Sequence, residues 1–167
     1  MRFSDNHDER RAIARFGERA ALAASAFVFT LDGVPMIYNG MEVGDTTESG
    51  APALFEKLPI FWSIAERRPE FPKFYKQMMA LRRSSVALRR GTLEWLKNSD
   101  EARVATFLRR TANEEVLVAI NFSSRPFFGS VEVSNAAAFT EADGMAGLPA
   151  LSLDAWGYRF FSHRSHR

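Results

Sequence analysis

Three adjacent side chains, Asn6, His7 and Asp8, can donate, accept and transfer protons. A neutral imidazole donates one hydrogen bond and accepts one, and an ionised carboxylate only accepts. Together these groups suit a polyhydroxyl ligand, or a reaction in which positive charge develops. Structural interpretations stay open beside this one. Asp5, Asn6 or Asp8 could cap the next helix, His7 could be a satisfied structural histidine, and a metal site lacks support from a second His or Cys cluster.

Helices and a short strand are predicted to position this cluster. Apolar residues at helical spacing predict one helix over residues 11–31 and another over residues 71–88. Between them, residues 34–38 are predicted to form a short buried strand. Because this strand shows no polar alternation, it indicates a parallel sheet covered on both faces. Residues 39–72 are rich in Gly and Pro, so we expect a functional rim or a disordered stretch, and the aromatic residues within it favour an ordered loop.

The second half of the chain reads as an all-β unit. Short alternating segments recur at roughly ten-residue spacing between polar turns, which is typical of antiparallel strands. The predicted strands are Thr92–Leu96, Val104–Leu108, Val116–Phe122, Val131–Val133, Leu151–Leu153 and Tyr158–Phe161. The change of character at Gly91 predicts a domain boundary near residue 90, which separates residues 1–90 from residues 91–167.

Composition limits the function classes. The chain of 167 residues has an apolar fraction of 46%, which indicates a packed interior. Its formal net charge of +2 gives no argument for nucleic acid. There is no cysteine, so disulfides and thiolate metal sites are excluded. The longest apolar run, residues 20–31, is shorter than the roughly 20 residues of a membrane span. No signal peptide is apparent; the location stays undetermined, with the cytoplasm favoured.

Two motifs resemble those of a known family. Residues 3–11 follow the pattern Phe-x-x-Asn-His-Asp-x-x-Arg, and residues 33–42 follow Gly-x-Pro-x-x-Tyr-x-Gly-x-Glu. Their order and spacing, with an apolar helix between them and an all-β unit behind, resemble the α-amylase family of glycoside hydrolases across essentially the whole chain. The resemblance implies the last two βα units of a (β/α)8 TIM barrel in residues 1–90, followed by an antiparallel β-sandwich.

The resemblance also implies roles for individual residues. Asp8 matches the carboxylate that stabilises the transition state, and His7, with Asn6 beside it, matches the groups that bind the sugar ring. The matched supporting positions, where packing and hydrogen bonding are expected, are Arg11, Tyr38 and Glu42. The implied substrate is an α-glucan or maltooligosaccharide cleaved with retention by a hydrolase, or transferred by a transglycosylase. No cofactor is implied for this chain, although the resemblance allows Ca²⁺ in the complete enzyme.

The nucleophile and the acid/base carboxylate have no matching motif here. In the family both come from earlier barrel strands, which would lie upstream of Met1, so we expect that the chain alone hydrolyses nothing. Roughly 250 further in-frame residues, the size of a typical barrel, would identify a miscalled start, whereas a stop codon upstream would indicate a genuine fragment or a split gene. Two alternatives remain: one chain of a split enzyme completed by a missing N-terminal barrel portion, or a non-catalytic carbohydrate-binding or interaction module in residues 91–167.

Aromatic side chains offer weaker indications of sugar binding. Phe55, Phe61 and Trp62 could stack on sugars at the rim, and Trp95 with Trp156 could form a patch on the β unit. Loop and core packing explain such residues at least as well.

Overall fold

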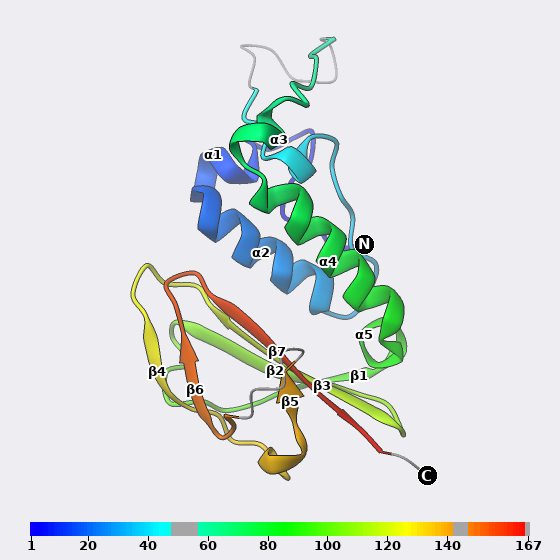
Figure 1. The fold of residues 1–167 in the computed structure, drawn as a ribbon, viewed down its shortest axis with the longest axis vertical. Helices are drawn as coiled ribbons and strands as arrows, with labels where there is room; N and C mark the ends of the chain where they lie inside the picture. The colour runs from blue at the N-terminus through cyan, green and yellow to red at the C-terminus, as the bar shows by residue number, and fades with distance from the viewer. Residues whose placement is uncertain (48–56, 142–146, 166–167) are drawn as a thin grey trace. The chain divides into compact units, whose positions relative to one another are not determined.

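The computed structural model describes residues 1–47, 57–141 and 147–165 (Figure 1). They form two compact units. The first comprises Met1–Phe29 and Gly33–Leu81, and the second comprises Thr30–Asp32 and Arg82–Arg167. The C-terminal residues of α2 and α4 thus belong to the second unit. The units divide between Leu81 and Arg82, whereas the sequence predicts a boundary near residue 90.

The first unit is built mainly from helices. They are α1 (Ala12–Phe16), α2 (Glu18–Thr30), the 3-10 helix η1 (Met41–Val43), α3 (Ile64–Arg67) and α4 (Glu70–Ser84). The prediction of one continuous helix over residues 11–31 is wrong at Gly17, which ends α1 with φ 81° and ψ 167°. A positive φ is readily adopted only by glycine, so this residue breaks a run that is otherwise apolar and helical.

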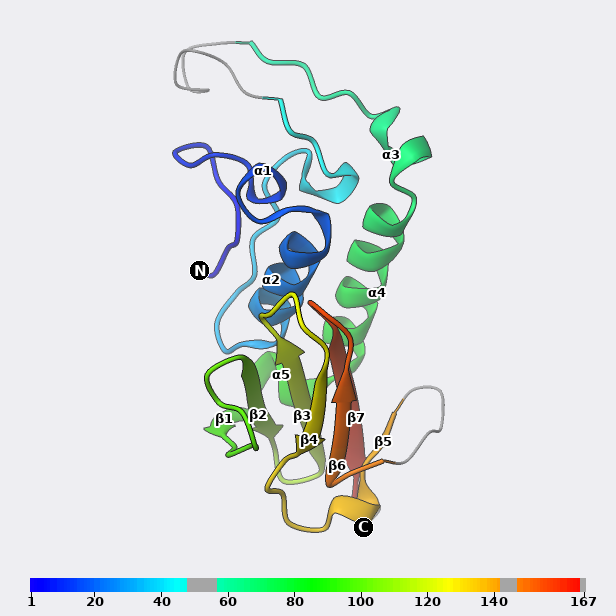
Figure 2. The ribbon, with the colours of Figure 1, turned by 90° about the vertical axis from the view of Figure 1, so that its left-hand side faces the viewer.

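Helices α2 and α4 lie side by side in both ribbon views (Figures 1 and 2). The Ser25 and Tyr75 hydroxyl oxygens are 2.9 Å apart, and Ser25 Oγ is also 3.1 Å from Ser4 Oγ. Burial raises the pKa of Tyr75 to about 12, so its hydroxyl stays protonated. The rings of Phe29 in α2 and Tyr75 in α4 also lie close together, with centroids 6.1 Å apart.

The predicted strand over residues 34–38 is reduced to one parallel bridge between Arg2 and Pro35. The Arg2 N–H donates to Val34 O at 2.8 Å, and the Met36 N–H donates to Arg2 O at 2.8 Å. Pro35 has no N–H, so it cannot extend the ladder itself. The expected parallel direction is present, but residues 34–38 form no longer strand than this bridge.

A buried carboxylate joins the short helix α5 (Val86–Arg90) to the β unit. Ser85 interrupts the predicted helix over residues 71–88, and its Oγ caps α5 by accepting from Leu88 N–H at 3.1 Å. Glu114 Oε2 accepts from Ser85 Oγ at 3.1 Å and from Ala87 N–H at 2.8 Å. These bonds explain why residues 82–90 belong with the second unit.

Every strand pair of the second unit is antiparallel, as expected. The strands are β1 (Thr92–Trp95), β2 (Val104–Arg110), β3 (Glu114–Asn121), β4 (Phe127–Ser130), β5 (Thr140–Glu141), β6 (Ala150–Leu153) and β7 (Tyr158–Arg164), with the 3-10 helix η3 (Ala136–Ala138) before β5. Their order is β1-β2-β3-β7-β5 in one sheet and β4-β6 in the other.

One hydrophobic core receives side chains from both sheets. It includes Leu108, Leu117 and Phe161 from the larger sheet, and Phe127 and Leu153 from the smaller one. The predicted strand over residues 131–133 is wrong: β4 ends before it, and Val131 forms only an isolated bridge with Asn98.

Glu114 gives the second unit a predictable response to acid. Burial by itself raises the pKa of Glu114, but the hydrogen bonds from Ala87, Arg164 and Ser85 outweigh burial and leave the pKa below its ordinary value of 4.5. A depressed folded pKa stabilises the folded state above the unfolded pKa, and this stability is lost as pH falls through the folded value. We therefore expect the free energy of unfolding of this unit to fall below about pH 4.5.

Urea unfolding between pH 3 and 7 measures this dependence. Glu114→Gln should make the acid loss less steep, whereas Glu115→Gln, the neighbouring and more exposed carboxylate, should leave it unchanged. An unaltered pH profile in Glu114→Gln would show that the network does not couple folding to protonation.

Candidate functional site

The exposed pair His7 and Asp8 forms the chemically accessible part of the first motif. His7 Nε2 lies 3.3 Å from Asp8 Oδ1, and the two side chains are 45% and 66% exposed. The His7 ring is 6.4 Å from the Tyr38 ring, between centroids. An imidazole and a carboxylate, adjacent and open to solvent, can together bind vicinal hydroxyl groups.

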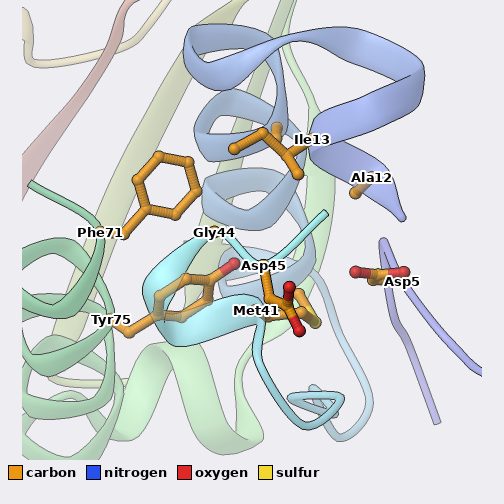
Figure 3. A pocket seen from close by; sticks show the side chains of 9 residues that line it. Asp5, Ala12, Ile13, Met41, Gly44, Asp45, Phe71 and Tyr75 are labelled. Atoms are coloured by element: carbon orange, nitrogen blue, oxygen red, sulfur yellow. The ribbon is translucent and has the colours of Figure 1, made fainter. Parts of the chain in front are cut away.

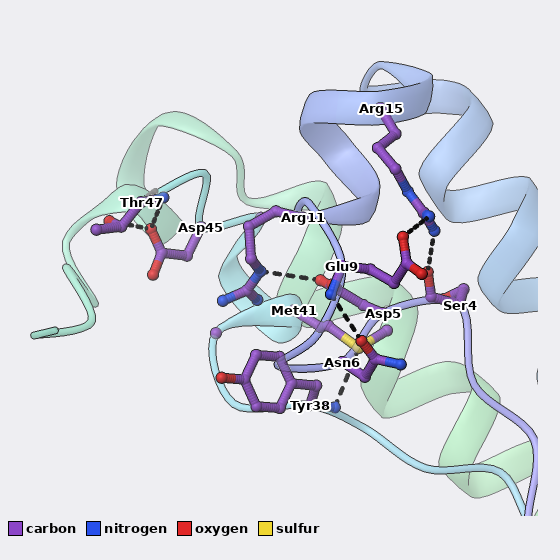
Figure 4. A network of polar contacts seen from close by, with 12 residues as sticks. Ser4, Asp5, Asn6, Glu9, Arg11, Arg15, Tyr38, Met41, Asp45 and Thr47 are labelled. Atoms are coloured by element: carbon purple, nitrogen blue, oxygen red, sulfur yellow. Dashed lines mark hydrogen bonds and ion pairs between the residues drawn. The ribbon is translucent and has the colours of Figure 1, made fainter. Parts of the chain in front are cut away.

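Asn6 shapes the turn that presents this pair. Its Oδ1 accepts from Asp8 N–H at 2.9 Å and from Glu9 N–H at 3.0 Å, as Figure 4 shows in part. An Asn side chain that bonds the backbone two and three residues later stabilises a local turn. The Asn6 carbonyl oxygen is thus engaged by the backbone, and the first helix begins after Arg11 without a side-chain cap.

A buried ion pair anchors both ends of this turn. Arg11 Nε donates to Asp5 Oδ2 at 3.0 Å, and the residues are only 8% and 3% exposed. Within the described residues, Asp5 Oδ1 and Arg11 Nη2 are buried atoms without a hydrogen-bond partner. Burial raises the pKa of Asp5, while the nearby positive charge of Arg11 opposes that rise.

The second motif packs against the same arginine. The Arg11 guanidinium carbon lies 4.9 Å from the centre of the Tyr38 ring, over its face. Gly40 follows with φ 91°, and a Cβ there would lie 3.0 Å from Asp45 Cβ and 3.3 Å from Arg11 Nη2. The motif glycine is therefore required for backbone conformation and for the close approach of its neighbours.

Glu42 and Asp45 stabilise the backbone of the second motif. Glu42 Oε2 accepts from Gly40 N–H at 3.0 Å. Asp45, only 2% exposed, accepts from the backbone N–H and the hydroxyl of Thr47 at 2.9 and 2.7 Å. The two motifs thus meet where Arg11 lies over the Tyr38 ring (Figure 4), with Gly40 close to the same guanidinium.

Residues of this network and of the helices α1, α2 and α4 together line a small cavity. It has about 10 Å³ accessible to the centre of a water molecule, which is room for about one water. Asp5, Asp45 and Tyr75 contribute its polar lining, and Ile13, Met41 and Phe71 contribute apolar side chains (Figure 3). The cavity is too small for a sugar, and the exposed His7 and Asp8 are not part of its lining.

Two structural residues of the site were missed in the sequence. The sequence indicates Asp5 only as a possible helix cap and gives no signal for Asp45. Their partners could not be inferred from spacing, because the Asp5–Arg11 pair spans a turn and has no helical or strand period. The roles of Asn6, His7 and Asp8 in binding and catalysis, and of Arg11, Tyr38 and Glu42 in support, stay predictions.

The aromatic residues that could stack on sugars at the rim are only partly within the described structure. Phe61 and Trp62 are 54% and 53% exposed in the first unit, and Phe55 lies outside the described residues.

In the part of the chain that is described, no group of three or more His, Asp or Glu side chains could hold a metal ion. No helix there is both long and apolar enough to cross a membrane.

Curated relatives resemble the chain over most of its length. It is 34% identical to Alpha-amylase 2 of Dictyoglomus thermophilum over 131 residues, which cover 74% of this chain and 22% of the relative. It is 32% identical to the intracellular maltogenic amylase of Bacillus subtilis strain 168, covering 68% of this chain and 19% of that protein. The chain therefore spans about a fifth of the length of these relatives.

Solved structures share the fold at low sequence identity. The trehalose-6-phosphate hydrolase of Bacillus licheniformis matches with a TM-score of 0.74 and 15% identity, over 98% of this chain and 43% of the other. The trehalulose synthase of Pseudomonas mesoacidophila MX-45 matches with a TM-score of 0.73 and 19% identity, over 96% and 42%.

The family profile described as "Alpha amylase, catalytic domain" matches residues 1–95, which is more than half of the chain. This match includes both motifs and the Asp5–Arg11 pair that joins the ends of the His7–Asp8 turn. The chain belongs to the α-amylase family of glycoside hydrolases.

Proposed function

We propose that this chain supplies one wall of the sugar-binding cleft of an α-amylase-type enzyme that acts on α-glucosidic bonds with retention. Residues 1–90 would form the last two βα units of a (β/α)8 barrel, and residues 91–167 an antiparallel β-sandwich. The observation that carries the proposal is the exposed His7–Asp8 pair on a turn held by a buried ion pair.

The proposed chemistry follows from the accessible groups. Asp8 would accept hydrogen bonds from sugar hydroxyls and stabilise the positive charge of an oxocarbenium-like transition state. His7 would bind the same ring, and Asn6 would hold the turn. Such contacts raise the rate when they strengthen in the transition state. Arg11, Tyr38 and Glu42 would fix the positions of these groups without touching the bond.

A retaining mechanism also needs a nucleophile and an acid/base carboxylate on opposite sides of the scissile bond. We propose that a complementary barrel portion provides them, in the same polypeptide or in a separate chain. The purified chain is then expected to release no sugar from maltotetraose, measured by chromatography of the products. Turnover that Asp8→Ala abolishes would contradict this proposal.

The described residues offer no cluster for a divalent cation.

A chimaera tests the role of Asp8. This chain would replace the matching segment of Alpha-amylase 2 from Dictyoglomus thermophilum, which provides the remaining barrel. Asp8→Asn is expected to lower kcat at least 100-fold, about 2.7 kcal/mol of transition-state stabilisation, because a neutral amide cannot stabilise developing positive charge. Glu9→Gln changes the adjacent carboxylate, which pairs with Arg15, and is the matched control.

The control should keep kcat within about twofold, which is about 0.4 kcal/mol. Equal losses in both variants of an active chimaera, or no loss in Asp8→Asn, would rule out the assigned role. A change in KM alone would make Asp8 a binding residue without a transition-state role.

A further inference from the structure

A groove of about 310 Å³ opens on the second unit beside β1, an edge strand of the larger sheet. This volume lies at the lower end of the range for small-molecule sites. The lining includes two partly exposed aromatic side chains, Trp95 and Phe122, beside the polar or charged residues Asn98, Glu101, Arg103 and Thr106. Trp156, which the sequence paired with Trp95, is not part of this lining.

The fold holds the Trp95 ring and the backbone of Phe122 in place. Trp95 is 58% exposed, yet its ring meets the fully buried Phe107 edge-on, with centroids 5.3 Å apart. Phe122 is 38% exposed, and its backbone N–H donates to Arg103 O at 2.8 Å. An aromatic surface that is already ordered loses little conformational entropy when a ligand binds.

The turn between β1 and β2 is equally ordered. Asn98 Oδ1 accepts from Asp100 N–H at 2.7 Å, and Asn98 Nδ2 donates to Val104 O at 2.9 Å. Asp100 Oδ2 accepts from Arg103 Nε at 2.6 Å. Because this contact neutralises Arg103 and Glu101 is acidic, the groove carries no excess positive charge to attract a phosphorylated or acidic ligand.

These features match the surface of a sugar ring. One face of a pyranose presents C–H groups, which the negative face of an indole attracts, while its edge carries hydroxyl groups. Glu101 can accept hydrogen bonds from those hydroxyls, and the Arg103 guanidinium can donate to them. We propose that this groove binds one ring of a neutral pyranosyl oligosaccharide, with Trp95 as the stacking surface.

The proposed site stands on residues of the second unit alone and does not depend on Asp8. Burial of one ring of about twelve heavy atoms, at about 0.3 kcal/mol per atom, corresponds to a Kd on the order of millimolar. Maltotriose is the suitable probe, because it is small, neutral and composed of α-linked glucose.

Titration of the full ¹⁵N-labelled chain with maltotriose to 20 mM, followed by NMR, tests the proposal. We expect saturable shifts of the Trp95 indole N–H and of the amides of residues 98–106. Trp95→Ala should weaken this binding at least tenfold. Phe128→Ala, which removes an 81% exposed aromatic side chain outside the groove lining, should leave the affinity unchanged.

A second variant, Glu101→Ala, keeps the test informative if Trp95→Ala disturbs the fold. It should weaken binding at least threefold while the remaining amide peaks keep their positions. Absence of saturable shifts, or equal affinity in Trp95→Ala and the unsubstituted chain, would overturn the proposal. Shifts confined to residues near His7 would also overturn it, while supporting sugar binding at the first motif. Asp8→Asn should keep the Trp95 response, so failure of one site is distinguishable from failure of the other.

Discussion

Replacement of Arg109 by Met is expected to lower the free energy of unfolding of the second unit by about 3 to 5 kcal/mol. Arg109 is 1% exposed, and its guanidinium donates to three backbone carbonyls. The donor–acceptor distances are 2.8 Å to Thr30 O, 2.8 Å to Gly91 O and 3.3 Å to Thr92 O. Met retains much of the volume but removes the guanidinium donor from these three carbonyls.

The location of these carbonyls explains why the loss should be large. Thr30 is the last residue of α2, and the final carbonyls of a helix have no partner within it. A positive charge there also interacts favourably with the helix dipole. Leu31 O is engaged in a similar way by Arg82 Nη1 at 3.2 Å. Two arginines therefore donate to backbone carbonyls where the chain leaves α2.

The adjacent residue provides the matched control. Arg110 is 46% exposed on the side chain and pairs with Glu94 and Glu115. Exposed ion pairs contribute little, so Arg110→Met should cost less than about 1 kcal/mol. Hydrogen exchange of the β2 and β3 amides during urea titration reports on this unit specifically. Similar losses in the two variants would show that the buried guanidinium has no special role.

Replacement of Asp5 by Ala is expected to destabilise the first unit by about 3 to 5 kcal/mol, because it leaves the Arg11 guanidinium buried without its carboxylate. The Asp5 and Arg11 side chains are only 3% and 10% exposed. The control, Glu9→Ala, breaks a pair of the same 3.0 Å length in which Glu9 is 56% exposed. That change should cost less than about 1 kcal/mol.

A double variant separates the charge from the packing. Asp5→Leu combined with Arg11→Met removes both buried charges and should recover much of the stability lost in Asp5→Ala. Hydrogen exchange of the α2 amides measures all three variants. If Asp5→Ala and Glu9→Ala lose equal stability, or if the double variant is the least stable, the buried pair does not have the assigned role.

The pH dependence of Asp5 has the opposite sign to that of Glu114. Burial raises the pKa of Asp5 above its ordinary value of 3.8. The favourable contribution of the protonated group is fully present below the unfolded pKa and is lost as pH rises through the folded value. Lowering the pH should therefore reduce the free energy of unfolding of the second unit through Glu114. Through Asp5, the same change should increase the free energy of unfolding of the first unit.

The sequence alone determined the family, through two motifs whose spacing and residue types match the α-amylase pattern. It also indicated the helical segments and the antiparallel β unit, because apolar periodicity reports which face of an element is buried. The extent of several elements was not predictable. Gly17 and Ser85 each interrupt an apolar run at helical spacing, and their effect depends on backbone torsions and capping.

Only the tertiary structure decided which polar groups meet. Arg11 pairs with Asp5, although Asp8 is closer in sequence, because the intervening turn points Asp8 to solvent and Asp5 inward. Trp95 and Phe122 line the same groove, although Trp156 was the expected partner of Trp95. The reason is strand pairing: β2 pairs with β1 on one side and with β3 on the other, which brings the end of β1 near the residue that follows β3. Spacing along the chain predicts a buried face, but ion pairs and grooves depend on distances between segments that only the folded chain fixes.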